Sequence, residues 1–429
     1  MVLPIQLPNQ YPVNSTDYLL LLFHKQLRKQ GKTGNVVRTV LYFDGTISLT
    51  QLQNLVHQNQ LLSSLNSYRV HESFPGKPSW WKLGPSPLPV SVSECFSPSN
   101  SIPTEILQLN LDPWGDGLIH LHLLNLPESK QALVVSVNHC FTDYRGVQEL
   151  VQLILQPSHP LNPNLVSKPD IELTFWPKLT NSLKIVGFML KSITSSIATI
   201  GNRKLGKDFQ TKRIIFSESQ SQTIDKDIQS KGLSLLPNVY FLAKTIWSFH
   251  TQIGFKQGNL LWLSIPIDSR KKGTPASILG NNLWFMFYQI PLSILSKGFP
   301  ELVQQLQQQT LDQLKLQLPQ KYAIMASWWK ALPHSIYRIF VNMPSRGRIS
   351  SLSFSNLGNC FPNLNNVLGH PIIGIENIPS NPSPPGIGIV IMKWNNQYAI
   401  NLTWEKNLLS YSEVEAIILQ LSQLPQSSD

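Results

Sequence analysis

The residues best suited to chemistry lie at the end of an apolar run in the first third of the chain. The run at 134–137 is followed by Asn138 and His139, and Asp143 lies four residues after the histidine. A histidine at a strand end has a firmly held backbone, while its imidazole can face a cleft. With an ordinary pKa of ~6.5, that ring can accept and return a proton near neutral pH. By residue type alone, a hydrogen-bonded structural histidine is the more frequent explanation.

Two further patterns resemble reactive sites, but each has a simpler explanation. His120 and His122 alternate along one apolar segment, so they share a face and have a spacing that can bind metal. No third ligand stands at a recognisable spacing, so we interpret them as a polar strand face and predict no metal site. Cys140 adjoins His139, but adjacent residues in a strand or turn point apart. We therefore expect Cys140 to be a small hydrophobic residue and not a nucleophile.

Length and composition limit the class of protein. The chain has 429 residues, of which 42% are hydrophobic and 9% aromatic, enough for two large domains or three small ones with real cores. Three cysteines without a CxxC spacing exclude a disulfide scaffold and suit a reducing compartment. No apolar run approaches the ~20 residues of a membrane span. The uncharged segment 1–14, with three prolines, does not resemble a secretory signal, so we expect a cytoplasmic protein.

The positive charge is concentrated in one segment. The net charge is +11, and the segment from Lys178 to Arg213 carries eight basic residues against a single aspartate. No nucleic-acid-reading motif accompanies this basicity, so we expect no nucleic acid partner. Apolar residues recur every three or four positions through the segment, at Leu183, Val186, Leu190, Ile193, Ile197 and Ile200. This pattern suits either an interfacial helix on an anionic bilayer or a crossover helix packed on its own protein, and we favour the second.

Helix and strand signals alternate along the whole chain and must position the histidine. In the first part, periodicity predicts helices at 18–28, 48–62 and 146–155, a strand at 36–43, and an antiparallel pair at 118–124 and 133–138. Five prolines mark a linker at 157–177. Beyond it we predict helices at 217–231, 238–255, 300–318 and 410–421, with strands at 214–216, 260–265, 283–290, 389–392 and 398–404. In the helix at 300–318, the buried side is expected to carry Leu302, Leu306, Leu311 and Leu314.

Several short motifs follow one another in a recognisable order. The pattern of His139, Asp143 and Gly146 falls between a strand and a helix, after 41–48 and 111–114. Later come Pro-Ile-Asp-Ser-Arg at 266–270, Gly280-Asn281, and Ser-Asn-Leu-Gly at 355–358. In this order they resemble the HxxxD motif and accompanying markers of the condensation-domain and acyltransferase superfamily, which has the chloramphenicol acetyltransferase-like fold. The resemblance spans about residues 10 to 425.

The resemblance implies both an architecture and an activity. The architecture is α/β (α+β), with mixed sheets in two chloramphenicol acetyltransferase-like subdomains and a cleft between them. The first subdomain, 1–165, carries HxxxD; a basic crossover, 166–213, leads to the second, 214–429. The implied activity is an acyltransferase that moves an acyl group from a thioester to a hydroxyl or amine. No cofactor is bound, and acyl-CoA or acyl-phosphopantetheine is the co-substrate.

Each motif residue receives a role by this resemblance. His139 would be the general base, and Asp143 would form an ion pair with Arg270 that ties the two halves together. Gly146 and Asn281 would support the site. Ser355 or Asn356 would donate to the developing oxyanion, with backbone N–H groups as an alternative. The expected partners are a thioester donor, a small-molecule or lipid-like acceptor and an acyl carrier protein, with membrane contact through 178–213 as a further option; we expect a monomer.

The sequence departs from the family pattern at two positions beside the histidine. Asn138 stands where many members have a second histidine, and Tyr144 stands where a glycine usually follows the aspartate. A tyrosine there would narrow the route to His139 or bind substrate. Two alternatives to the acyltransferase therefore stay open. One is a catalytically silent binding protein on the same fold, and the other is a stand-alone amide-forming condensation module that acts in trans.

Overall fold

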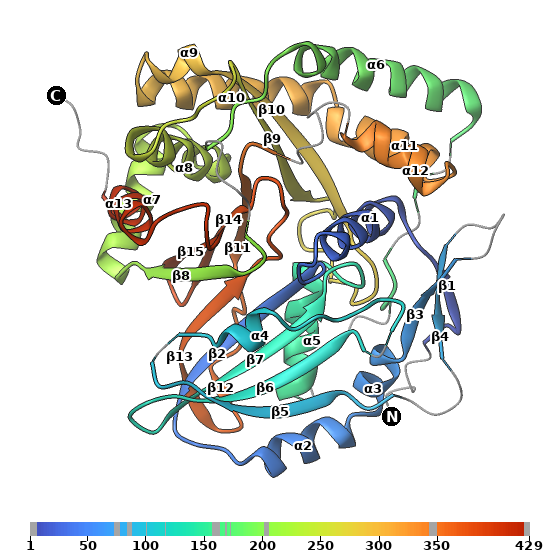
Figure 1. The fold of residues 1–429 in the computed structure, drawn as a ribbon, viewed down its shortest axis with the longest axis vertical. Helices are drawn as coiled ribbons and strands as arrows, with labels where there is room; N and C mark the ends of the chain where they lie inside the picture. Colours follow the sequence, from blue (N-terminus) through green and yellow to red (C-terminus); the bar gives the residue numbers. More distant parts are fainter. Residues whose placement is uncertain are drawn as a thin grey trace.

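Two halves, each with its own mixed sheet, enclose the histidine loop between them (Figure 1). The structure is a computed structural model that describes residues 7–72, 78–83, 88–99, 101–115, 117–156, 164–167, 170–171, 173–200, 206–342 and 350–423. This architecture agrees with the α/β fold with mixed sheets expected from the sequence. Among these residues, no helix combines the length and apolar character needed to cross a bilayer.

The N-terminal half is built around a six-stranded sheet in the order β12-β13-β2-β7-β6-β5. In this sheet β7 lies between β2 and β6 and is antiparallel to both, as the sequence predicted for β6 and β7. A smaller three-stranded sheet, β1-β4-β3, flanks it. The strands of this half are β1 (Gln10–Pro12), β2 (Val36–Asp44), β3 (Tyr68–His71), β4 (Ser79–Lys82), β5 (Ser91–Phe96), β6 (Ile119–Asn125) and β7 (Lys130–Asn138).

The helices of this half begin at polar caps that the sequence provides. Asn14, Ser48 and Asp143 accept hydrogen bonds from the first turns of α1, α2 and α5. Asn59, the polar break in the predicted helix 48–62, ends α2 and caps α3 instead. The helices are α1 (Ser15–Lys29), α2 (Leu49–Gln58), α3 (Gln60–Asn66), α4 (Thr104–Leu107) and α5 (Tyr144–Leu155).

The C-terminal half contains a four-stranded sheet, β11-β14-β15-β8, and the ribbon β10-β9. Its strands are β8 (Phe209–Ile215), β9 (Leu260–Asp268), β10 (Leu283–Pro291), β11 (Ser353–Asn359), β14 (Ile387–Trp394) and β15 (Gln397–Glu405). Its helices are α6 (Phe175–Thr194), α7 (Glu218–Ser230), α8 (Pro237–Gln252), α9 (Leu292–Leu295), α10 (Phe299–Lys315), α11 (Leu318–Trp329), α12 (His334–Asn342) and α13 (Tyr411–Ser422). The final helix begins at Ser410 with the predicted capping box.

Two late strands cross into the sheet of the first half. β12 (Asn366–Val367) pairs with β13 (His370–Ile378), and β13 runs antiparallel to β2 (Figure 1). We placed residues 214–429 in the C-terminal subdomain, but this segment therefore contributes two strands to the N-terminal sheet. The exchange had no sequence signal, because a strand's partner depends on long-range packing and not on its own pattern.

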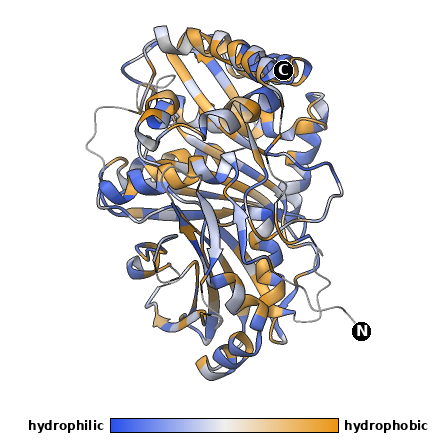
Figure 2. Ribbon diagram, turned by 90° about the vertical axis from the view of Figure 1, so that its right-hand side faces the viewer, coloured by the Kyte–Doolittle hydropathy of each residue, from blue (hydrophilic) through white to orange (hydrophobic). Residues whose placement is uncertain are grey.

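Each half has its own hydrophobic core. The larger core joins α1 and α5 to the first sheet, and the second joins α8, α10 and α13 to the strands of the C-terminal half. Figure 2 shows hydrophobic and hydrophilic residues interleaved along the helices and strands of both halves. This interleaving gives each element one face for the core and one for solvent.

Two predicted apolar faces are wrong, each for a packing reason. In α6, Ile185 and Met189 are buried against α11, while Leu183 and Leu190 are exposed. Ile197 lies beyond the end of that helix and forms an isolated bridge with Leu260. The predicted stripe therefore mixes two faces of α6 with a segment outside it.

In α10, Leu302 and Leu306 are buried as predicted, but Leu311 and Leu314 are exposed. The buried positions of the last turns carry Thr310 and Gln313 instead. The Gln313 Oε1 accepts a 2.9 Å hydrogen bond from the Phe287 N–H, and the Thr310 hydroxyl lies 3.0 Å from that of Tyr288. Gln313 thus provides a partner for a backbone N–H at the edge of β10, and Thr310 for the buried Tyr288 hydroxyl.

Candidate functional site

His139 immediately follows β7, in a turn that both halves hold. Its N–H donates to the Asn35 carbonyl at 2.8 Å, and its own carbonyl accepts from Asn281 Nδ2 at 3.0 Å. Its ring nitrogen Nδ1 lies 2.9 Å from the Thr142 carbonyl oxygen. A carbonyl oxygen only accepts hydrogen bonds, so Nδ1 must carry the proton. In the neutral ring, Nε2 then has the free lone pair.

The surroundings of His139 favour its neutral form. Burial lowers the pKa of His139 below the ordinary 6.5, and the hydrogen bond to Thr142 and the charge of Asp143 offset this only in part. At neutral pH the ring is therefore unprotonated and can accept a proton at Nε2. A general base requires this state.

Asp143 is turned into the protein and does not hydrogen-bond the imidazole. Its Oδ1 accepts from the Gly146 N–H at 3.1 Å, which caps α5, and its Oδ2 accepts from the Asn282 N–H at 2.8 Å. Arg270 Nη2 donates to the same Oδ2 at 2.6 Å, and both side chains of this ion pair are buried. The structure thus contains the ion pair expected from the sequence. This ion pair joins the histidine loop to the second half.

A second ion pair, which the sequence did not reveal, lies beside the first. Arg145 Nη1 donates to Asp268 Oδ2 at 2.9 Å, and Asp268 Oδ1 accepts from Arg270 Nη1 at 3.0 Å. Arg145 belongs to α5 and Asp268 to β9, so the contact also joins the halves. Acidic and basic side chains alternate through Asp143, Arg270, Asp268 and Arg145, an arrangement in which each charge has an opposite neighbour.

Asn281 holds the histidine loop from the side of the second half. Its Nδ2 lies within hydrogen-bonding distance of the carbonyls of His139 and Cys140, at 3.0 and 3.3 Å. Its N–H and Nδ2 both lie 2.8 Å from Asp17 Oδ1. Burial raises the pKa of Asp17 to about 7, although the hydrogen bonds from Asn281 oppose that rise. The sequence motif marked Asn281 but gave no reason to select Asp17, which lies inside the first helix.

Gly146 is required by close packing. A Cβ atom at this position would collide with Thr142 Oγ1 and would lie 2.9 Å from the Ser277 carbonyl oxygen. It would also lie 3.1 Å from the carbonyl oxygen of Ile278. The absence of a side chain lets α5 approach the segment before Asn281, which completes the support of the histidine loop.

His139 lines a cavity of about 300 Å³ between the two halves. Its wall includes side chains of α1 and β2 from the first half and of β9, β10, β11 and β14 from the second. About half of the lining residues are apolar and the rest are polar or charged, so the cavity can hold an apolar body and orient a polar group. The polar and charged lining residues are Asn35, Arg38, Thr39, Asp143, Arg145, Ser264, Asp268, Arg270, Ser353, Ser355, Asn356, Asn377 and Ser380.

Tyr144 lines this cavity without filling it. Its hydroxyl accepts a 2.7 Å hydrogen bond from Asn377 Nδ2 on β13. Its ring stands at 84° to that of Phe361, with ring centroids 6.3 Å apart. These contacts hold the ring at the wall. The sequence suggested that Tyr144 narrows the route to His139. Both residues nevertheless line the cavity of about 300 Å³.

The two candidate oxyanion donors on β11 differ in availability. Asn356 is engaged, because its Nδ2 donates to Asn238 at 2.8 Å and its Oδ1 accepts from the Gly358 N–H at 3.0 Å. Phe354, two residues earlier on the same strand face, packs into the second core. Ser355 points to the opposite face of β11, and Phe354, Ser355 and Asn356 all line the cavity with His139.

The contacts of the remaining candidate residues from the sequence indicate structural roles. Asn138 accepts a 2.8 Å hydrogen bond from the Cys140 N–H and so stabilises the turn at the histidine. Burial raises the pKa of the Cys140 thiol, which opposes a thiolate nucleophile. The rings of His120 and His122 stack with centroids 4.2 Å apart. Within the described residues, no group of three His, Cys, Asp or Glu side chains is arranged to hold a metal ion.

Three solved structures share this fold over nearly their whole lengths. A trichothecene 15-O-acetyltransferase from Fusarium sporotrichioides has a TM-score of 0.69 at 10% identity, covering 96% of this chain and 93% of its own. The first condensation domain of the calcium-dependent antibiotic synthetase, bound to a substrate analogue, has a TM-score of 0.68 at 11% identity, covering 97% and 96%. A wax ester synthase/diacylglycerol acyltransferase from Marinobacter aquaeolei VT8 has a TM-score of 0.59 at 13% identity, covering 96% and 98%.

These similarities confirm the fold that the order of motifs predicted. The chain has the fold of condensation domains and acyltransferases. No protein-family model matches the chain, and no curated protein matches its sequence. At identities this low the shared property is the architecture, so the reaction must be argued from the site.

Sequence reasoning missed several residues that build the site. The segment Pro-Ile-Asp-Ser-Arg contains Asp268, so its charge beside Arg270 was a usable signal. The backbone carbonyl of Asn35 and the amide of Asn377 had none, because they act through contacts between distant strands. Arg38 also lines the cavity, but its guanidinium donates to the carbonyls of Ile106 and Leu107 at 2.8 and 2.7 Å, which indicates a structural role.

Proposed function

We propose that the protein is an acyltransferase that moves an acyl group from a thioester to a hydroxyl or amine acceptor. One observation carries the proposal. His139 presents an unprotonated Nε2, fixed by the Nδ1 hydrogen bond to Thr142, at the wall of a cavity between the two halves. The fold shared with acyltransferases and condensation domains supports the same class of reaction.

In the proposed reaction, the acceptor enters the cavity with its hydroxyl or amine beside Nε2 of His139. Nε2 removes the proton as the acceptor oxygen or nitrogen forms a bond to the thioester carbonyl carbon. The carbonyl oxygen becomes an oxyanion, and we assign its stabilisation to the Ser355 hydroxyl and backbone N–H groups. The carbon–sulfur bond then breaks, and the proton on Nε2 passes to the departing thiolate. General base catalysis of this kind contributes ~10²–10⁴-fold.

Asp143 has no place in the proton transfer in this scheme. Its carboxylate oxygens are already occupied by Arg270 and by the N–H groups of Gly146 and Asn282. We assign to it the positioning of the loop that carries His139. We assign the same role to Gly146 and Asn281. Tyr144 and Asn377 form part of the cavity wall and are candidates for contact with substrate.

The proposed donor is an acyl thioester of coenzyme A or of a carrier protein. A donor panel tests the reaction: acyl-CoA and acyl-carrier thioesters are offered with alcohol and amine acceptors, with thiol release and product mass as readouts. Transfer from at least one thioester in the wild type supports the proposal. Thioester binding without turnover across the panel would favour the silent binding protein. Amide formation from carrier-bound donors alone would favour the condensation module.

We also propose that α6 is a peripheral membrane contact, because one of its faces is apolar and lies outside the protein. Trp176, Leu183 and Leu190 recur at intervals of seven and are 71%, 61% and 53% exposed. The exposed Lys184 lies beside them and complements an anionic lipid surface. Co-sedimentation with anionic vesicles at low salt tests this contact. Binding that weakens in Trp176→Ser and Leu183→Ser, but not in the control Leu419→Ser on α13, supports it, and no binding by the wild type contradicts it.

A further inference from the structure

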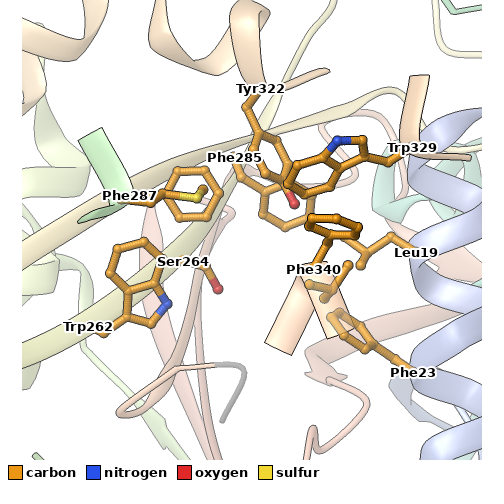
Figure 3. Close-up of a pocket in the computed structure, with 11 residues that line it drawn as sticks. Leu19, Phe23, Trp262, Ser264, Phe285, Phe287, Tyr322, Trp329 and Phe340 are labelled. Atoms are coloured by element: carbon orange, nitrogen blue, oxygen red, sulfur yellow. The ribbon is translucent and has the colours of Figure 1, made fainter. Parts of the chain in front are cut away.

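An aromatic pocket adjoins the cavity of His139 and has no role in the proton transfer proposed above. Its walls come from α1, α6, the ribbon β9-β10, α11 and α12 (Figure 3). Figure 3 shows the rings of Phe285, Tyr322, Trp329 and Phe340 gathered on one side of this pocket. We define the aromatic pocket by its lining residues Leu19, Phe23, Met189, Trp262, Ser264, Phe285, Phe287, Tyr322, Trp329, Phe340 and Val341.

The aromatic pocket and the His139 cavity are neighbours in space. Phe23, Ser264 and Phe285 line both of them. These residues belong to α1, β9 and β10, so the border lies where the first helix meets the ribbon of the second half. A ligand with its reacting group beside His139 can therefore extend its other end toward the aromatic pocket.

The chemistry of the aromatic pocket excludes charged and strongly polar groups. Among the residues that the structure describes, no charged side chain lines it, and Ser264 is its one small polar side chain. Burying an ion or an unpaired hydrogen-bonding group there would carry a desolvation cost without a partner. Hydrocarbon carries no such cost and gains contact with the flat faces of the rings.

The size of the pocket limits how much of a ligand it holds. Its volume of about 60 Å³ corresponds to roughly four to six water-sized spheres, at ~10–15 Å³ each. It therefore holds about four to six non-hydrogen atoms, the end of a chain and not a whole substrate. An acetyl group bound beside His139 would leave it empty.

We propose that the aromatic pocket binds the end of an unbranched hydrocarbon chain whose reacting end lies at His139. This inference rests on the proposed function, since it names the substrate class of the same site. The chain belongs either to the acyl group of the donor or to a lipid-like acceptor, because both would place an apolar tail in the same direction. Each methylene that enters the pocket should raise kcat/KM or affinity about fourfold. Four methylenes together correspond to roughly a hundredfold or more.

Two series of ligands distinguish the two sources of the chain. In the first, acyl-CoA length increases from acetyl to dodecanoyl with one fixed acceptor. In the second, alkanol length increases with one fixed acyl-CoA. Binding of the same acyl-CoAs and alkanols is measured in parallel by calorimetry, with coenzyme A alone as the baseline. A rise of roughly a hundredfold or more with length in one series supports the proposal and identifies the source, whereas flat profiles in both series overturn it.

Paired variants test whether this pocket is the cause of the length preference. Met189→Trp adds volume inside the pocket and should shift the preferred chain to shorter lengths, while Leu419→Trp on the exposed face of α13 should not. Phe340→Ala enlarges the pocket and should shift it to longer lengths, while Ile339→Ala on the exposed face of α12 should not. The two substitutions are independent of each other. If the Met189→Trp variant folds poorly, the comparison of Phe340→Ala with Ile339→Ala still tests the pocket. A preference that stays the same in Met189→Trp and Phe340→Ala overturns the inference.

Failure of the pocket and failure of the proposed function give different results. Length-dependent binding that responds to Met189→Trp, in a protein that turns over no thioester, would overturn the acyltransferase and support the pocket. Transfer of acetyl and dodecanoyl groups at equal rates, to short and long alkanols alike, would support the acyltransferase and overturn the pocket.

Discussion

The buried ion pair between Asp143 and Arg270 should contribute strongly to stability, and removal of one partner should show it. In Arg270→Met, the Asp143 carboxylate keeps only the N–H groups of Gly146 and Asn282. The side chains of Arg270 and Asp143 are 6% and 1% exposed, so water cannot replace the lost guanidinium. Removing one partner of such a pair costs about 3–5 kcal/mol.

Urea unfolding of four proteins measures this energy: wild type, Arg270→Met, Asp143→Asn and the double variant. The asparagine keeps the side-chain oxygen that caps α5, but its Nδ2 replaces the oxygen that accepts from the Asn282 N–H. Its effect therefore reports the lost charge together with that lost hydrogen bond. We expect the double variant to lose about 1–3 kcal/mol less unfolding free energy than the two single variants lose together. Lys130→Met is the matched control, because its partner Glu128 is 78% exposed and a solvent-exposed pair of this kind contributes little to stability. Single variants that lose less than ~1 kcal/mol, with additive effects, would refute the reasoning.

Three further predictions follow from the site. Burial lowers the pKa of His139, so activity should rise with pH through a midpoint below 6.5, and a midpoint above 7 would contradict a buried base. Burial raises the pKa of Asp17 to about 7 from 3.8, so the ionised carboxylate opposes folding above pH 7 and this cost fades as pH falls toward 4. The unfolding free energy of Asp17→Asn minus that of wild type should therefore be larger at pH 8 than at pH 5. At ~1.4 kcal/mol per pKa unit the increase is up to a few kcal/mol, and the same difference at both pH values would disprove this. Gly146→Ala should lower the unfolding free energy by about 1–3 kcal/mol through its clash with Thr142. Gly187→Ala, in open space on α6, should instead raise it by about 0.4–1 kcal/mol, and similar urea midpoints for the two variants would argue against the clash.

Local sequence patterns predicted the elements around the histidine well. The strand that ends at Asn138 and the helix that follows Asp143 are present where the apolar runs placed them, although the helix begins at Tyr144, two residues before the predicted start. The antiparallel pair β6–β7 is also confirmed. These features depend on neighbours in the chain, and so the chain itself contains the signal.

Features that depend on contacts between distant segments were predicted less well. The expected face of α6 was wrong because packing against α11 selects Ile185 and Met189 over leucines of equal hydrophobicity. The joining of β13 to β2 and the hydrogen bonds of Asp17 to Asn281 span more than two hundred residues. The pairing of Asp143 with Arg270 spans 127 residues, but the order of motifs made it predictable. The order of motifs can therefore indicate a contact between distant residues, whereas hydrophobic periodicity does not.

The most direct test of the central claim is acyl transfer by His139→Ala. With a thioester and acceptor that the wild type uses, thiol release and acylated product are measured together, and circular dichroism and urea unfolding check that the variant is folded. We predict that the folded variant loses transfer by ~10²–10⁴-fold, and that added imidazole restores part of it by replacing the missing base. A folded variant that forms product at the wild-type rate would contradict the assignment of His139 as the base.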